Sequence, residues 1–273
     1  MAHMTFTYFS RALGMEVRLE AVLPELYRSQ WQPRMPLVLL LHGMSDCESS
    51  YMRLSALERH AREHQVVIVT PATHMGSYTN QYAGSRYFDF VADELPEVCA
   101  AYLPVLTDRE HLWAAGLSMG GYGALKLGFK YPERFSRIAA MSAGCDRAAL
   151  LAPACADIST LEELYEKRDQ LDARQFQGLM QFLATYGSRE RFMKDETNNL
   201  FLLAEKAAQK DVLPAVCMWC GTEDMLAIEP NRRFHVHLKK LGIEHRYIED
   251  HGVHDWFYWD SHLPAVLDWL DQK

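Results

Sequence analysis

The chain of 273 residues has no excess of basic charge and no long apolar run. It carries 28 Lys and Arg against 36 Asp and Glu, which gives a formal net charge of −8. Nucleic-acid-binding surfaces need clustered basic side chains against the phosphates, so this balance argues against a nucleic-acid partner. No apolar stretch approaches the roughly 20 residues of a membrane-spanning helix, so we expect no membrane association. With 49% hydrophobic and 23% charged residues, the composition also excludes a disordered chain.

The cysteines are few and scattered, unlike the framework of a disulfide-rich secreted protein. Cys217 and Cys220 form a C-x-x-C motif, but the surrounding AVCMWCG is typical of a buried strand. Side chains three apart on a strand point to opposite faces, so this pair is poorly placed to share a metal. We therefore predict buried free thiols and no metal site. The six cysteines are Cys47, Cys99, Cys145, Cys155, Cys217 and Cys220.

Short apolar strands alternate with amphipathic helical stretches, which predicts an α/β fold with a mostly parallel sheet covered on both faces. The first two strands should form an antiparallel hairpin. Strands are predicted at residues 5–10, 14–23, 37–41, 66–70, 111–117, 135–142, 215–220 and 245–250. Helices are predicted at residues 50–64, 87–102, 119–131, 231–241 and 256–270.

The strand pattern disappears for about 70 residues between Ala143 and Leu213. The segment LEELYEKRDQLDARQFQGLMQFLATYG within it is typical of helix with one charged side. We expect a helical insert, a lid, at about 143–212, before the penultimate strand. Residues 1–4 resemble a remnant of a cloning vector, so residues 5–273 are expected to form the single domain.

Residues 116–120 read Gly-Leu-Ser-Met-Gly, the G-x-S-x-G pattern, between a predicted strand and a predicted helix. This strand–turn–helix setting is that of a nucleophile elbow. A sharp, strained turn would lift the Ser118 oxygen above the sheet edge, and side chains at positions 116 and 120 would collide with neighbouring backbone. The free N–H groups at the helix start would favour a developing anion. We predict that Ser118 is a catalytic nucleophile.

A serine nucleophile needs a histidine base that is held by a carboxylate. The acid should follow the penultimate strand, where we favour Asp224 over Glu223 because Asp224 lies deeper in the loop. The base should follow the last strand, where we favour His254, just before the terminal helix, over His251. Asp255 is interpreted as a charge at the start of that helix.

An oxyanion hole should complete the site. One donor should be the backbone N–H of Met119, directly after the nucleophile. The second should come from the loop after strand 37–41, where we favour the N–H of Met44 over that of Ser45. Such donors are typically worth about 3–4 kcal/mol of transition-state stabilisation each.

Four further residues are candidates for substrate contact. Tyr78 and Tyr82 belong to the loop THMGSYTNQYAG after a sheet strand, although this could equally be a polar surface loop. Met225 follows the expected acid and Trp256 follows the expected base. Flexible thioether side chains tolerate varied acyl groups, and core filling is the alternative for the methionines.

With these pieces in place, the sequence resembles the esterase D-like branch of the α/β-hydrolases, and most of all the bacterial tributyrin esterases (acetyl esterases). The resemblance rests on LHGMSD at 41–46, ELPEV at 94–98, GLSMGGYGALKL at 116–127, WCGTEDML at 219–226 and HDWFYW at 254–259. It covers roughly residues 5–270 and departs most in the helical insert. It implies an α/β-hydrolase fold with about eight strands and the roles already given to Ser118, Asp224 and His254.

The resemblance also implies a cytoplasmic serine carboxylesterase for short acyl chains, acting on a small-molecule ester without cofactor or metal, and it is compatible with a homo-oligomer. S-formylglutathione hydrolases, other thioesterases and feruloyl esterases are related alternatives. An acyltransferase differs only in the acceptor that takes the acyl group. A catalytically silent binding protein would keep the fold without the chemistry.

Overall fold

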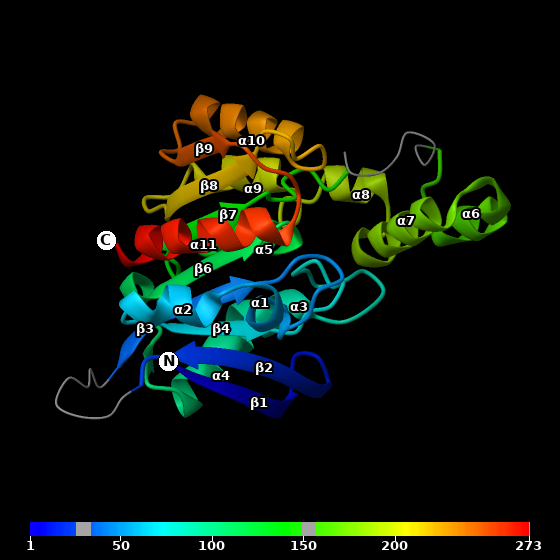
Figure 1. The fold of residues 1–273 in the computed structure, drawn as a ribbon. Helices are drawn as coiled ribbons and strands as arrows, with labels where there is room; N and C mark the ends of the chain where they lie inside the picture. The colour runs from blue at the N-terminus through cyan, green and yellow to red at the C-terminus, as the bar shows by residue number, and fades with distance from the viewer. Residues whose placement is uncertain (26–33, 149–156, 273) are drawn as a thin grey trace.

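The computed structural model describes residues 1–25, 34–148 and 157–272. Its centre is a mostly parallel sheet with the strand order β1-β2-β4-β3-β6-β7-β8-β9, in which the short β5 also pairs with β3 (Figure 1). β1 and β2 form the predicted antiparallel hairpin, and β2 joins β4 antiparallel. The strands are β1 (Ala2–Ser10), β2 (Met15–Leu23), β3 (Met35–Leu41), β4 (Val67–Pro71), β5 (Val105–Leu106), β6 (Leu112–Leu117), β7 (Arg137–Met141), β8 (Ala215–Gly221) and β9 (Arg246–Asp250).

All eight predicted strands are confirmed. β5 was not predicted, since a two-residue strand carries no periodicity for the sequence to show. β1 also begins earlier than predicted, because Ala2, His3 and Met4 pair with residues 21–23 of β2. Central strands such as β3 are buried almost throughout, as their continuous apolar sequence indicates.

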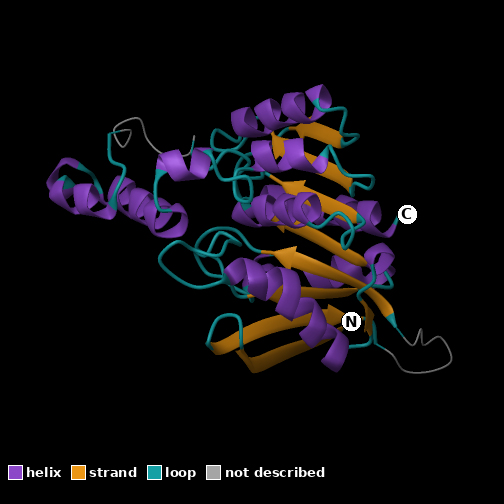
Figure 2. Cartoon of the chain, turned by 180° about the vertical axis from the view of Figure 1, so that it is seen from behind, coloured by secondary structure: helices purple, strands orange, loops and turns teal. Residues whose placement is uncertain are grey.

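Helices cover both faces of the sheet (Figure 2). One face carries a large core under α4, α5, α9 and α10, and the other carries a second core under α1, α2 and α11. Their bounds are α1 (Ser50–Leu54), α2 (Leu57–His60), α3 (Tyr87–Asp89), α4 (Leu95–Tyr102), α5 (Met119–Lys130), α9 (Leu200–Ala207), α10 (Ile228–Lys240) and α11 (Trp256–Asp271). Short helical turns are η1 (Ala61–Glu63), η2 (Phe90–Glu94, a π turn) and η3 (Arg109–His111).

The predicted helix 50–64 is interrupted, which corrects that prediction. Ser55 adopts an extended backbone conformation after α1. Its hydroxyl donates to the Tyr51 carbonyl at 2.6 Å. A serine side chain that bonds nearby backbone competes with the helical hydrogen bonds, so the segment divides into α1, α2 and η1.

The insert between β7 and β8 is helical, as predicted, and α6 and α7 project beyond the sheet (Figure 1). It contains α6 (Leu161–Glu166), η5 (Arg168–Gln170), α7 (Ala173–Tyr186), α8 (Arg189–Met193) and α9. A separate small cluster of buried side chains, including Leu179, Phe182 and Phe192, holds α6 to α8 together. α6 and α7 each begin with a capping box, which fixes where they start.

The two cysteines of the C-x-x-C motif lie in β8 as buried free thiols, as predicted. Cys145 and Cys99 are buried free thiols as well, whereas Cys47 is partly exposed. Cys155 lies outside the described residues. Across the described ranges, no group of three His, Cys, Asp or Glu side chains is arranged to hold a metal ion, and no helix is both long and apolar enough to cross a bilayer.

Candidate active site

Ser118 lies in a strained turn between β6 and α5. Its φ of 51° is in the left-handed region, which costs a residue other than glycine about 1–3 kcal/mol. A side chain at position 116 would come within 2.4 Å of Gly120 backbone, and one at position 120 within 1.9 Å of the Leu41 carbonyl. The predicted elbow is therefore present, and its two glycines are required by close backbone approach.

Ser118, His254 and Asp224 form one hydrogen-bonded chain. The Ser118 hydroxyl lies 3.0 Å from His254 Nε2, and His254 Nδ1 lies 2.7 Å from Asp224 Oδ2. The three residues come from β6–α5, from the loop after β8 and from the loop after β9, at the carboxyl ends of the strands. Their sequence order and spacing are those expected of a nucleophile, an acid and a base.

Asp224 is fully buried. Burial alone would raise the pKa of this carboxyl, but the hydrogen bond and charge of His254, with help from Ser142 and the Ala227 N–H, hold it below its usual value. The carboxylate is therefore charged at neutral pH and can hold the imidazole and balance a positive charge on it.

Glu223 and His251, the alternatives considered for the acid and the base, pair with each other. Glu223 Oε1 lies 2.9 Å from His251 Nδ1, and the other oxygen accepts from the Gly252 N–H at 2.8 Å. His251 is largely exposed, and no contact joins this described pair to Ser118. Asp255 caps α11 by accepting from the Tyr258 N–H at 2.9 Å, as interpreted from the sequence.

The N–H groups of Met44 and Met119 lie in the two segments beside Ser118. Met119 is the first residue of α5, where backbone N–H groups lack intrahelical acceptors. Within the described residues, neither N–H is used by another backbone or side-chain acceptor. Ser45 has a φ of 70°, so the chain turns sharply just after Met44.

His42 and Tyr78 support that loop from inside the protein. His42 Nδ1 donates to the Gly43 carbonyl at 2.7 Å, while Nε2 accepts from the Thr73 N–H at 3.1 Å. These two bonds require the neutral imidazole, and burial lowers the pKa of His42 to about 4. The Tyr78 hydroxyl donates to the His42 carbonyl at 2.9 Å.

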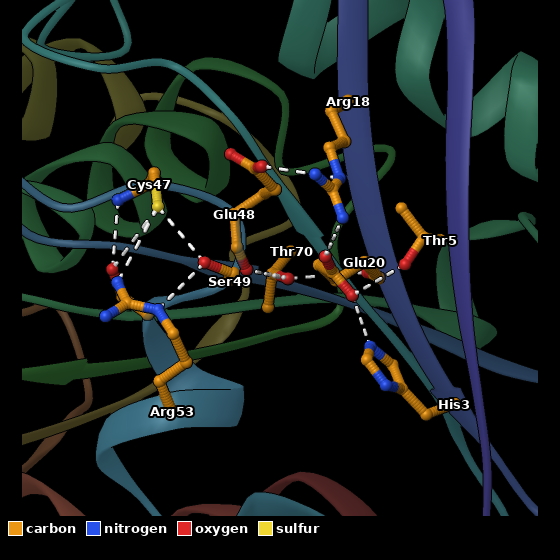
Figure 3. A network of polar contacts seen from close by, with 10 residues as sticks. His3, Thr5, Arg18, Glu20, Cys47, Glu48, Ser49, Arg53 and Thr70 are labelled. Carbon is orange, nitrogen blue, oxygen red and sulfur yellow. Dashed lines mark hydrogen bonds and ion pairs between the residues drawn. The ribbon is translucent and has the colours of Figure 1, made fainter.

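The same loop is joined to the N-terminal hairpin by a polar network (Figure 3). Arg18 of β2 lies 3.4 Å from Glu20 and 3.7 Å from Glu48. Thr70 donates to the Glu48 carbonyl at 2.7 Å, and Glu20 also contacts His3. These contacts extend from the hairpin through β4 to the loop that begins at His42, so the edge strands help to position the loop.

A cavity of about 550 Å³ opens at the Ser118–His254 pair. This volume is in the range of small-molecule sites. Its lining residues come from the end of β6, from the loops after β3, β6, β7, β8 and β9, from the start of α11 and from α7 of the insert. They are Gly43, Met44, Asp46, Leu117, Ser118, Ser142, Gly144, Arg147, Arg174, Gly178, Gln181, Phe182, Leu226, Ala227, His254, Asp255, Trp256 and Trp259.

Of the four substrate-contact candidates, only Trp256 lines this cavity. Tyr78 is buried in the core, where its ring fills the space beside Gly123 and its hydroxyl holds His42. Tyr82 is 60% exposed under Arg191, and Met225 is 87% exposed. The loop prediction went wrong because Ser77 and Tyr78 both take left-handed conformations, which turn the tyrosine inward.

Sequence reasoning missed the insert side of the cavity. Arg147 follows the end of β7, and Arg174, Gly178, Gln181 and Phe182 lie along one side of α7. The position of Arg147 after a strand's carboxyl end was a usable signal. Nothing in the local sequence showed which face of α7 would turn toward Ser118.

Comparisons with known proteins identify the family of this chain. Residues 10–270 match the family model described as "Putative esterase". An acetyl esterase of Caldicellulosiruptor saccharolyticus is 25% identical over 279 residues, covering 100% of this chain and 99% of that protein. The substrate-bound structure of fluorophosphonate-binding serine hydrolase F from Staphylococcus aureus superposes with a TM-score of 0.81 at 25% identity, over 100% of this chain and 99% of that one.

An S-formylglutathione hydrolase from the same bacterium shares the fold, with a TM-score of 0.78 at 24% identity, over 98% of each chain. Fold and site together define a serine hydrolase of the α/β-hydrolase class. Within that class the chain belongs to the esterase family, as the match over nearly its whole length shows, and it is a carboxylic ester hydrolase.

Proposed function

We propose that the protein is a serine carboxylesterase for short acyl chains, with Ser118 as nucleophile, His254 as base and Asp224 as acid. The single observation that carries this assignment is the hydrogen-bonded chain from Ser118 through His254 to the buried Asp224. The acetyl esterase relative supports the preference for a small acyl group.

In the proposed reaction, His254 Nε2 takes the Ser118 proton as the oxygen attacks the ester carbonyl. The imidazolium that forms is stabilised by Asp224 and then protonates the leaving alcohol. This leaves an acyl-enzyme on Ser118. Water, deprotonated by His254, attacks that acyl group in the second half of the reaction and releases the acid.

The N–H groups of Met44 and Met119 would hold the carbonyl oxygen while it is negative. Both are backbone groups, one in the loop after β3 and one at the start of α5, so they need no rearrangement as charge develops. Asp46, whose pKa burial raises, accepts from the Gly43 N–H at 3.2 Å and so helps to fix the backbone before Met44.

We further propose a cytoplasmic location, with which the free thiols of the described cysteines are compatible. Fractionation of the source cells followed by immunodetection would test it. Recovery outside the cytoplasm would contradict this part of the proposal without affecting the chemistry.

The test is hydrolysis of p-nitrophenyl esters from acetyl to dodecanoyl by the wild type and by Ser118→Ala. We expect a rate that peaks at short chains and falls by about 10⁵–10⁶-fold in kcat in the variant, because triad members act as a unit. Ser261→Ala, on α11 away from the cavity, is the matched control and should retain the full rate. A near-normal rate in Ser118→Ala would overturn the site assignment, and a Ser118-dependent rate on thioesters alone would overturn the oxygen-ester function.

A further inference from the structure

Two arginines line the cavity beside Ser118, and the proposed reaction uses neither. Arg147 lies in the segment after β7, and Arg174 lies in the first turn of α7. The acidic residues that line the same cavity are Asp46 and Asp255. Each of these already accepts a hydrogen bond from a nearby backbone N–H, Asp46 from Gly43 and Asp255 from Tyr258 in the first turn of α11.

The Arg147 side chain is buried, and no residue in the described ranges supplies a counter-charge to it. The residue is only 8% exposed, and its Nη2 donates to Ser77 Oγ at 3.2 Å. Its Nε has no hydrogen-bond partner, and its guanidinium carbon lies 5.9 Å from the centre of the Tyr122 ring. Among the described residues no carboxylate forms an ion pair with Arg147; the adjacent Asp146 pairs with Arg233 at 3.1 Å instead.

A buried cation without a partner is costly, and so is a buried donor without an acceptor. An unsatisfied buried group calls for an explanation, and a ligand that supplies the missing acceptor is one. A guanidinium presents its N–H groups as a planar fork that matches the two oxygens of a carboxylate. Arg147 lines the cavity that holds Ser118, so its guanidinium is placed to bind a carboxylate on the substrate.

We propose that Arg147, with Arg174 nearby on the lid, binds a carboxylate of the substrate, so that the enzyme prefers esters that are negatively charged on the acyl or the alcohol part. This inference rests on the proposed function of the same site. Arg147 is a substrate-binding residue in this account, and the reacting atoms remain those of Ser118 and His254.

The experiment compares two matched pairs of substrates. p-Nitrophenyl hydrogen glutarate and p-nitrophenyl methyl glutarate differ by a charge on the acyl part, while 4-acetoxybenzoate and methyl 4-acetoxybenzoate differ by a charge on the alcohol part. The wild type should prefer the charged member of at least one pair by about tenfold or more in kcat/KM, as expected for a hydrogen bond between charged groups. Which pair shows the preference locates the carboxylate.

Arg147→Met should abolish that preference by raising KM for the charged ester about tenfold or more, with kcat and the neutral ester little changed. Arg147→Lys should retain part of the preference, because it keeps the charge without the fork. Arg189→Met, elsewhere in the insert, is the matched control and should keep the whole preference. Equal losses on charged and neutral esters in Arg147→Met would overturn the inference.

Inhibition of the wild type gives a result that does not depend on how the variants fold. Free glutarate should compete with a neutral ester more strongly than glutaramide does. The enzyme could cleave the neutral esters through Ser118, show no preference for the charged esters, and be inhibited no more strongly by glutarate than by glutaramide. That result would overturn this inference and leave the proposed function standing. Absence of Ser118-dependent cleavage of all four esters would instead overturn the proposed function.

Discussion

The two sides of the cavity are built differently. The Ser118 side is formed by loops at the carboxyl ends of five parallel strands, which lie between the two large cores of the protein. The insert side is formed by α7, which belongs to a small cluster of its own under α6 to α8. The Ser118 side holds the groups to which we assign acyl transfer, whereas we expect the insert side to determine which substrates fit.

The largest loss of activity on the Ser118 side is expected from a change of the acid. Asp224→Asn should lower kcat by about 10³–10⁴-fold, because the amide donates where the carboxylate accepted and favours the wrong imidazole tautomer. The thermal midpoint and the kcat of each variant should be measured together. Glu223→Gln is the matched control, since this neighbour pairs with the exposed His251, and its kcat should stay within about twofold of the wild type.

A full loss of activity in Glu223→Gln with none in Asp224→Asn would exchange the two residues. Loss in both variants would show instead that the whole loop after β8 is sensitive to charge.

A second effect on the Ser118 side is expected at His42, and it concerns the free energy of unfolding and not the rate of the reaction. Burial lowers its pKa from the ordinary value of 6.5 to about 4, so the unfolded chain binds a proton between these values while the folded protein does not. This contribution to stability is full above pH 6.5 and falls by up to about 3 kcal/mol as pH drops to 4. Urea denaturation of the wild type and His42→Gln across this window tests it, since the glutamine variant should lose that part of the slope.

Identical pH slopes in the two proteins would contradict the neutral, buried state of His42 and its support of the Gly43–Met44 backbone.

On the insert side the smallest change is expected, and it should alter substrate choice alone. Gly178 lies on α7 at the cavity, and a Cβ added there would meet no atom within 4 Å. Gly178→Leu should stabilise the helix by about 1 kcal/mol. Its side chain would occupy cavity space, so kcat/KM for octanoyl esters should fall about tenfold relative to acetyl esters.

Gln177→Leu, at the preceding exposed position of α7, is the control for added hydrophobic surface and should leave the chain-length profile unchanged. An unchanged profile in Gly178→Leu would show that α7 does not limit the acyl chain. An equal loss on every chain length would show that the lid affects the chemistry itself.

The same difference between the two sides explains what the sequence could predict. The fold could be predicted because continuous apolar runs mark the buried strands. The hydrogen-bonded chain could be predicted because the elbow glycines stand beside Ser118, and because Asp224 and His254 each follow a predicted strand. Tyr78 could not, because its inward direction depends on left-handed backbone at residues 77 and 78. Gly178 could not, because its position depends on how the insert packs against the sheet, whereas Arg147 could have been found from its place after β7.

The central claim is that Ser118 is the nucleophile of this site. Reaction with a fluorophosphonate, followed by mass spectrometry of the intact protein and of its peptides, tests that claim most directly. We expect a single adduct on Ser118, much slower labelling in His254→Ala, and none in Ser118→Ala. An adduct on another residue, or undiminished labelling of Ser118→Ala, would contradict it.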